Sequence, residues 1–262
     1  MTYPEINPVA LDLGFAQIYW YGIMYLLAFT TAFLLARYRA KHSAGVWRTT
    51  QVEDLIFYGA IGAVVGGRVG YMLFYNLPAF LNDPSILFAI QGGGMSFHGG
   101  FLGVLLAMVW FNRKHHKTFF ATMDFVAPLV PLGLGFGRLG NFINGELWGA
   151  PTTSSLGMYI PSEGISRYPT QLYEAFLEGL VLFLILWFAS QKPRASMTIS
   201  SLFLIFYGIF RFAVEFVRLP DAHIGYLAFG WLTMGQLLSA PMIGLGLYLL
   251  YRANKQKYES IY

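Results

Sequence analysis

The chain has 262 residues, of which 56% are hydrophobic and only 11% are charged, and its formal net charge is +4. A soluble domain carries about 25% charged residues, so this chain has too few charges to cover a water-exposed surface. Disorder is excluded because a disordered chain needs low hydrophobicity and high charge. The absence of cysteine excludes a disulfide scaffold, thiolate metal sites and a cysteine nucleophile. The composition therefore predicts an integral membrane protein.

Seven segments approach the length of about 20 apolar residues that a helix needs to cross a bilayer. They lie near 17–37, 54–75, 94–111, 119–139, 171–189, 197–217 and 231–251. We therefore expect an all-α membrane protein with seven transmembrane helices and one membrane domain over 1–262. The longest loop on the outer side is expected at 140–170, where it would cover the functional site.

Most of the lysines and arginines fall in alternate loops and in the tail. They are Arg37, Arg39, Lys41, Arg48, Arg113, Lys114, Lys117, Lys192, Arg194, Arg252, Lys255 and Lys257. The positive-inside rule then predicts an outer (periplasmic) N-terminus and a cytoplasmic C-terminus. Since the basic charge follows the topology, we expect no nucleic-acid partner.

The other five arginines lie in spans or on the outer side: Arg68, Arg138, Arg167, Arg211 and Arg218. At ~1.5 Å of rise per residue, Arg68 and Arg211 lie ~21 Å above the cytoplasmic ends of their spans, and Arg138 lies ~28 Å above. His98 is expected ~20 Å above the inner surface, and Tyr21 near the outer end of the first span. A charge in a helix centre costs about 2.5–3.5 kcal/mol on insertion scales and usually marks function. These positions predict a polar cavity in the outer half of the bilayer.

Two helix faces carry several of these polar groups. The sixth span has a stripe at i, i+4, i+8 and i+11, formed by Tyr207, Arg211, Glu215 and Arg218. Arg211 is expected to bind an anionic group, because a guanidinium matches phosphate geometry and stays charged. Glu215 is expected to orient the arginines beside it. Glu174 and Glu178 share a face of the fifth span, and one of them is expected to pair with an arginine.

The densest feature is the segment 137–149, which holds four glycines and several polar residues. Glycine and proline interrupt helices, and broken helix at membrane depth is tolerated where it lines a cavity or is buried in protein. A plain helix end explains the glycines, but not the combination of Arg138, Asn141, Asn144 and Glu146. This combination predicts a functional site.

Two weaker features are left open by the sequence. His98 follows a glycine-rich stretch at 91–100, and it could accept a proton or hydrogen-bond a neighbouring helix. Arg68 follows two glycines, and it could bind a lipid phosphate or pair with a carboxylate. The adjacent histidines at 115 and 116 are poorly spaced for a helical metal site, so we expect no metal.

The stretch GRLGNFINGELWG at 137–149 closely resembles the signature of the prolipoprotein diacylglyceryl transferases, which are bacterial inner-membrane enzymes. Five further stretches are similar to blocks of the same family: IYWYGIMY (18–25), GGRVGYMLFY (66–75), GGGMSFHGG (92–100), RYPTQLYEA (167–175) and YGIFRFAVEFVR (207–218). Their order and the seven-span layout fit along essentially the whole chain.

The resemblance implies a reaction between phosphatidylglycerol and the lipobox cysteine of a preprolipoprotein, whose signal peptide is itself a membrane helix. The sn-1,2-diacylglyceryl group passes to the cysteine sulfur, which forms a thioether and releases glycerol 1-phosphate. This is the first step of bacterial lipoprotein maturation. The resemblance also implies a multi-pass protein of the inner (cytoplasmic) membrane, without metal or soluble cofactor. A monomer is expected because nothing in the sequence demands an oligomer.

The resemblance also assigns roles to residues. Those at positions regarded as important in the family are Tyr21, His98, Arg138, Asn141, Glu146, Gly149, Tyr207 and Arg211. We expect Arg138 and Arg211 to stabilise the leaving phosphate, and His98 to be the candidate base for the thiol. Substrate binding is expected of Tyr21, Arg68, Asn141, Asn144, Glu146, Gly149 and Tyr207. Support of the arginines is expected of Glu174, Glu215 and Arg218.

Three other classes of protein share some of these features. Broken helices and intramembrane charges also occur in transporters and channels, but here no matching polar set lines the inner half. An intramembrane protease could use His98 as its base, although Ser96 is too close in sequence to be a convincing nucleophile. A seven-span receptor would not need so many charged residues in several helices.

Overall fold

The computed structural model describes residues 1–89, 93–220 and 225–255. Gln91 and Gly92 of the glycine-rich stretch and Lys257 of the basic tail lie outside the described residues. Within the described residues, five helices are long and apolar enough to cross a membrane. They are α1 (Trp20–Lys41), α2 (Thr49–Tyr75), Phe119–Ile143, Thr170–Ala189 and α10 (Met234–Asn254). The chain is therefore a mostly helical, multi-pass membrane protein.

The other two predicted spans are also helical. The segment expected at 94–111 forms α4 (Phe97–His115), and the segment expected at 197–217 forms α9 (Thr198–Val214). Helix α9 is apolar but shorter than the five spanning candidates, and α4 is not among those five. A total of seven spans and the sidedness of the termini therefore stay predictions.

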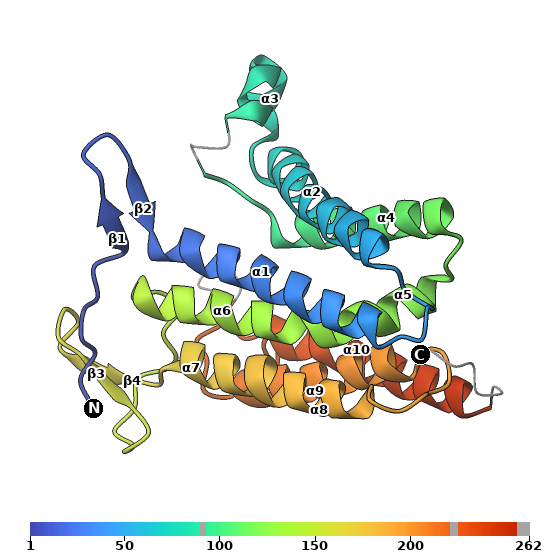
Figure 1. Cartoon of the computed structure of the whole chain (residues 1–262). Helices are drawn as coiled ribbons and strands as arrows, with labels where there is room; N and C mark the ends of the chain where they lie inside the picture. Colours follow the sequence, from blue (N-terminus) through green and yellow to red (C-terminus); the bar gives the residue numbers. More distant parts are fainter. Residues whose placement is uncertain (90–92, 221–224, 256–262) are drawn as a thin grey trace. The chain divides into compact units, whose positions relative to one another are not determined.

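The chain divides into two compact units. The first comprises Met1–Ala36 and Met123–Tyr262, and the second comprises Arg37–Thr122. In the first unit, α6 (Val130–Ile143), α8 (Leu182–Ala189), α9 and α10 run side by side (Figure 1). A buried cluster of Ala127, Leu182, Leu186 and Ile199 forms part of its core.

Two of the apolar helices change their winding midway. The prolines at 128 and 131 coincide with a 3₁₀ turn, η3 (Ala127–Leu129), between α5 (Phe119–Val126) and α6. The other helix passes from α7 (Thr170–Glu174) through a π-helical segment, η4 (Ala175–Val181), into α8. Such π segments are frequent at functional sites.

The helix of the fourth predicted span extends beyond its predicted end at residue 139. Helix α6 runs to Ile143 rather than 139, through Gly133, Gly135, Gly137 and Gly140. A backbone at membrane depth must satisfy its hydrogen bonds internally, which favours continued helix over a break at glycine. The glycines instead permit close packing: a Cβ on Gly135 would lie 3.2 Å from the Cα of Gly179.

Two small sheets accompany the helices, which the all-α expectation did not include. A hairpin of β1 (Val9–Asp12) and β2 (Gln17–Tyr19) leads directly into α1. The segment expected as a loop at 140–170 begins inside α6 and contains β3 (Met158–Ile160) paired with β4 (Ile165–Arg167).

A buried carboxylate fixes the start of α9. Asp124 of α5 accepts hydrogen bonds from the backbone amides of Met197 and Ser200, both at 2.7 Å. The first amides of a helix have no partner within the helix, and their dipoles favour a negative charge. Asp124 therefore ties α9 to α5 within the first unit.

In the second unit, α2 and α4 pack through small residues. Gly62, Gly66 and Gly70 of α2 face Gly99 and Gly103 of α4. A Cβ on Gly66 would collide with the carbonyl oxygen of Gly99 and lie 2.8 Å from the Cα of Gly103. Small residues at such positions let two membrane helices approach closely, so their backbones are in direct contact.

We predict that Gly66→Ala lowers the free energy of unfolding by about 1–3 kcal/mol, because the added methyl group overpacks the contact. The matched control is Gly59→Ala on the same helix, where the new Cβ would lie 3.8 Å from Met108 Cε. Thermal unfolding in detergent would compare the two variants. An equal effect of both would contradict the packing argument.

Candidate functional site

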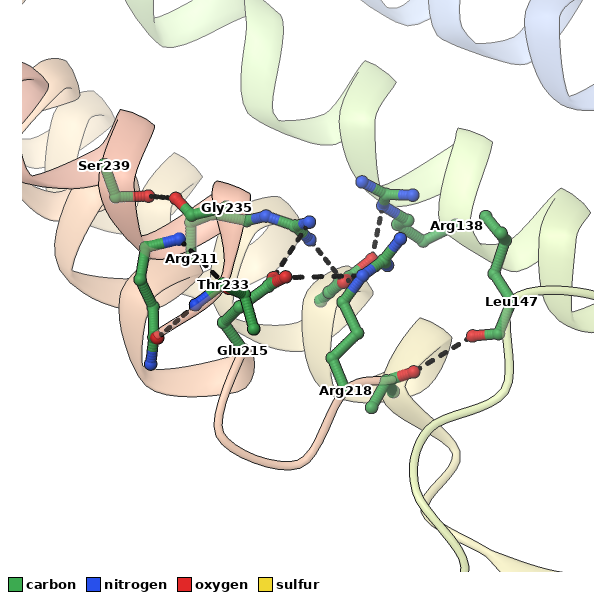
Figure 2. Close-up of polar contacts among 11 residues, drawn as sticks. Arg138, Leu147, Arg211, Glu215, Arg218, Thr233, Gly235 and Ser239 are labelled. Carbon is green, nitrogen blue, oxygen red and sulfur yellow. Dashed lines mark hydrogen bonds and ion pairs between the residues drawn. The ribbon is translucent and has the colours of Figure 1, made fainter. Parts of the chain in front are cut away.

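Three arginines converge on one buried carboxylate in the first unit. Glu174 is 1% exposed, and its Oε2 lies 2.6 Å from Arg138 Nε. Its Oε1 lies 2.6 Å from Arg211 Nη1 and 2.9 Å from Arg218 Nη1. We call these four residues the arginine cluster. Figure 2 shows the three guanidinium groups turned toward this common centre.

The members of the arginine cluster come from separate parts of the chain. Arg138 lies in α6, Glu174 is the last residue of α7, and Arg211 lies in α9. Glu215, one turn after Arg211, contacts Arg211 Nη2 at 3.0 Å and Arg218 Nε at 3.8 Å. The sequence placed Arg211, Glu215 and Arg218 on one helix face, but α9 ends at Val214, so Glu215 and Arg218 lie in the turns that follow the helix. The structure adds that Glu174, rather than Glu178, pairs with the arginines.

Glu215 is buried beside the start of α10. A Cβ on Gly235 would lie 2.6 Å from the carboxyl carbon of Glu215, so a larger residue would displace the carboxylate. Figure 2 shows Glu215 between Gly235 and the arginines. The glycine thus allows α10 to approach the arginine cluster closely.

Arg138 keeps donors that the carboxylate does not use. Only its Nε contacts Glu174, and in Figure 2 its two terminal nitrogens point away from that contact. Its side chain is 24% exposed, more than that of Arg211 or Arg218. A guanidinium held through Nε with both terminal nitrogens free is suited to binding a phosphate through two parallel hydrogen bonds.

Glu178 is a second buried carboxyl group near the arginine cluster. It is 1% exposed, and among the described residues its Oε1 has no hydrogen-bond partner. It lies in η4, one turn after Glu174, within electrostatic range of the three arginines. In the sequence, Glu178 was recognisable only by its helical spacing from Glu174. That spacing could not show which of the two carboxylates pairs with the arginines.

The turn after α6 is built around Glu146. Its Oε1 accepts hydrogen bonds from Asn141 Nδ2 at 2.8 Å and Asn144 Nδ2 at 3.3 Å. Its carbonyl oxygen accepts a hydrogen bond from Gln171 Nε2 at 2.5 Å. We call residues 141–146 the Asn–Glu turn. The sequence predicted the two asparagines and Glu146 as a group, but it gave no role to Gln171, which lies one turn before Glu174.

Tyr21 lies next to the Asn–Glu turn. A Cβ on Gly140 would lie 2.8 Å from Tyr21 Cδ2, so the ring packs directly on the α6 backbone. The Tyr21 side chain also hydrogen-bonds that of Asn141. The structure therefore brings Tyr21 together with the residues with which the sequence grouped it.

Gly149 and Tyr207 both lie in close contact with neighbouring residues of the first unit. A Cβ on Gly149 would lie 2.5 Å from the carbonyl oxygen of Val217 and 2.6 Å from Thr170 Cγ2. Gly149 thus lets Val217 and Thr170 approach closely, and its expected contact with substrate stays a prediction. The ring of Tyr207 stacks on Phe203, with centroids 5.7 Å apart.

Arg68 belongs to the second unit, where it contacts backbone carbonyl oxygens. Its guanidinium is buried and donates to five backbone carbonyl oxygens, those of Ile86, Leu87, Ala89, Gly93 and Gly94. A guanidinium has five N–H donors, so this set occupies all of them. Arg68 therefore holds together the chain segment before α4, and its expected contact with substrate stays a prediction.

His98 also lies in the second unit, in the first turn of α4. It is exposed and lines a pocket of about 360 Å³ together with Phe74, Tyr75 and Ser96. Ser96 caps α4 by accepting a hydrogen bond from the Gly99 amide at 3.2 Å. No hydrogen bond to the His98 imidazole is found among the described residues, so its alternative role as a helix-to-helix link gains no support.

The amino-acid sequence is similar to that of known proteins along nearly its whole length. The sequence profile of the family described as prolipoprotein diacylglyceryl transferase matches residues 8–252. The chain belongs to this family. Proteins named phosphatidylglycerol–prolipoprotein diacylglyceryl transferase are similar along nearly their whole length. The one from Marinomonas sp. is 55% identical over 257 residues, covering 97% of this chain and 96% of the relative.

A relative with the same name from Pseudomonas putida is 53% identical over 261 residues, covering 98% of this chain and 97% of its own length. The one from Pseudomonas fluorescens is 54% identical over 257 residues, covering 97% and 95%. The family inferred from six sequence stretches is thus confirmed, and the class of enzyme is a transferase.

We predict that Glu174→Gln lowers the free energy of unfolding by about 3–5 kcal/mol, because three guanidinium groups lose their shared counter-charge. The matched control is Glu163→Gln, which breaks a 2.5 Å pair with Arg167 in which Glu163 is 38% exposed. The control should lose less than about 1 kcal/mol. Thermal unfolding in detergent would measure both, and similar losses would contradict the central role of Glu174.

Proposed function

We propose that this chain transfers the sn-1,2-diacylglyceryl group of phosphatidylglycerol to the lipobox cysteine thiol of a preprolipoprotein. The relatives are named for this lipid and this protein acceptor. The observation that carries the proposal within the chain is the arginine cluster, in which Arg138 keeps free donors for a phosphate. The reaction would be the first step of lipoprotein maturation.

The proposed reaction is a displacement at carbon. The cysteine sulfur, as thiolate, attacks the sn-3 carbon of the diacylglyceryl group, and the bond from that carbon to the phosphate oxygen breaks. The products are a thioether and glycerol 1-phosphate, and the thiol proton passes to a base. Negative charge develops on the leaving phosphate, so fixed positive groups in a water-poor site lower the barrier. Arg138 and Arg211 would supply these groups.

Glu174 would hold the arginines ready for this charge. Its carboxylate fixes Arg138 through Nε and Arg211 through Nη1, while Glu215 holds Arg211 Nη2. A preorganised charge needs no rearrangement when the phosphate leaves, which is the source of its catalytic effect. Tyr21 and the Asn–Glu turn, which contact one another beside Gly140, would orient the headgroup by hydrogen bonds.

We further propose that His98 accepts the proton of the thiol. A thiol with a pKa near 8.5 reacts as thiolate, so a base that takes up the thiol proton increases the reactive fraction. His98 is exposed at the start of α4 and lines a pocket, which is compatible with access for a substrate. The chain itself contains no cysteine, so transfer would be direct and not relayed through an enzyme thioester.

The membrane setting completes the proposal. The chain would be a monomer with seven spans in the bacterial inner membrane, its N-terminus in the periplasm and its C-terminus in the cytoplasm. The signal peptide and the lipid would reach the site from within the bilayer, and the segment that contains β3 and β4 would cover it. No metal or soluble cofactor is part of the proposed reaction.

Arg138→Ala and Arg211→Ala should each lower transfer about 10²–10³-fold, because the leaving phosphate loses a charged partner. Lysine at either position should rescue poorly, since its point charge lacks the two-pronged geometry. The assay combines purified protein, phosphatidylglycerol and a synthetic lipobox peptide, and follows glycerol phosphate release and peptide mass. Arg113→Ala, at an exposed position, is the control. Full activity in either cluster variant would refute the phosphate role.

His98→Asn should lower the transfer rate more than it weakens lipid binding, because asparagine cannot accept the thiol proton. The same assay gives kcat, and binding of phosphatidylglycerol to the variant gives the affinity. If rate and affinity fell equally, His98 would be a structural residue and the proposed base would have to be sought elsewhere.

A further inference from the structure

The N-terminal segment reaches the end of the helix that carries Arg138. The hydroxyl group of Tyr3 lies 3.0 Å from the carbonyl oxygen of Phe142 and 3.1 Å from that of Ile143. Ile143 is the last residue of α6, and the Asn–Glu turn begins within the same helical turn. The last four carbonyls of a helix have no partner within the helix, so a donor at this point fixes where the helix stops.

The Tyr3 ring is held as firmly as its hydroxyl. It is 6% exposed and packs edge-on against Phe142, with centroids 5.3 Å apart, and against Trp148 at 5.0 Å. Trp148 in turn donates from Nε1 to the carbonyl oxygen of Gly145 at 3.0 Å. These contacts support the Asn–Glu turn at two points, Phe142 and Gly145.

The backbone of the N-terminal segment is also anchored. The amide of Tyr3 donates to the carbonyl oxygen of Tyr159 at 2.8 Å, and the amide of Tyr159 donates to that of Met1 at 2.8 Å. Strand β3 therefore fixes the backbone of Tyr3, while α6 holds its hydroxyl group. Burial raises the pKa of the Tyr3 hydroxyl above its ordinary value of 10.0, so the group keeps its proton and remains a donor at neutral pH.

Glu146 depends on the geometry that Tyr3 stabilises. Its amide donates to the carbonyl oxygen of Asn141 at 3.0 Å, and its carboxylate accepts from Asn141 and Asn144. Gly145 has a φ of +68°, and a Cβ there would lie 3.3 Å from the Tyr3 hydroxyl oxygen. The turn thus contains a left-handed glycine, and the three atoms nearest to an added Cβ all belong to Tyr3.

We propose that Tyr3 is a positioning residue for the transfer reaction, which sets the end of α6 and so the orientation of Asn141, Asn144 and Glu146. Tyr3 acts through the turn and does not touch the substrate. The inference rests on the proposed role of the Asn–Glu turn in holding the lipid headgroup. It gives a function to the N-terminal segment, which belongs neither to the family motifs nor to the arginine cluster.

Tyr3→Phe tests this proposal, because it removes the hydroxyl group and keeps the ring packing. We expect kcat/KM for phosphatidylglycerol to fall about three- to tenfold, the size of one lost hydrogen bond. The loss should be the same between about pH 6 and 9, because the hydroxyl does not ionise in that range. The matched control is Tyr159→Phe, whose ring is 43% exposed, and it should keep wild-type activity.

A double variant separates positioning from general stability. If Tyr3 acts through the turn, Tyr3→Phe should have less effect in an Asn144→Ala background than in the wild type. Additive losses, or a wild-type rate in Tyr3→Phe while Asn144→Ala is impaired, would overturn the inference. If Asn144→Ala and Glu146→Gln both kept full transfer, the proposed role of the turn would fail instead. Melting temperatures of all variants would identify losses that come from unfolding.

Discussion

The burial of one carboxylate organises the first unit of this protein. Glu174 is 1% exposed, and an unpaired buried charge would be costly. Its oxygens are satisfied by Arg138, Arg211 and Arg218, so α6, α7 and α9 must meet at this point. The arginines depend equally on Glu174, because without it three positive groups would lie together. This mutual dependence ties the stability of the fold to the arrangement proposed for the reaction.

The glycines of α6 do not act as the helix breakers that a sequence containing many glycines usually predicts. The glycines near Arg138 were expected to interrupt the helix, yet α6 continues through them to Ile143. What they provide is space, as at Gly135 against Gly179 and at Gly140 against the Tyr21 ring. In a bilayer the backbone must satisfy its hydrogen bonds internally. Keeping a glycine within a helix therefore costs less free energy than interrupting the helix at that glycine. Close approach of backbones then brings polar side chains from different helices together.

The two units use arginine differently. In the first unit the guanidinium groups face carboxylates, and Arg138 keeps free donors. In the second unit Arg68 is enclosed by backbone carbonyl oxygens, so its charge organises the chain before α4. Both arginines were singled out for the same reason, a charge at membrane depth. The difference arises because hydropathy reports only that a charge is buried, whereas its partner depends on which segments fold around it.

The amino-acid sequence alone was sufficient to predict the membrane character, the approximate positions of the apolar helices and the family. These depend on composition, on runs of about 20 apolar residues and on short ordered stretches, all of which are local properties. Three other features became visible in the folded chain: Glu174 rather than Glu178 pairs with the arginines, Gly149 is closely packed, and Tyr3 meets the end of α6. Each of these contacts joins residues that are distant in the chain. Helical spacing cannot predict them, because it fixes the face on which a side chain lies but not the segment that the face meets.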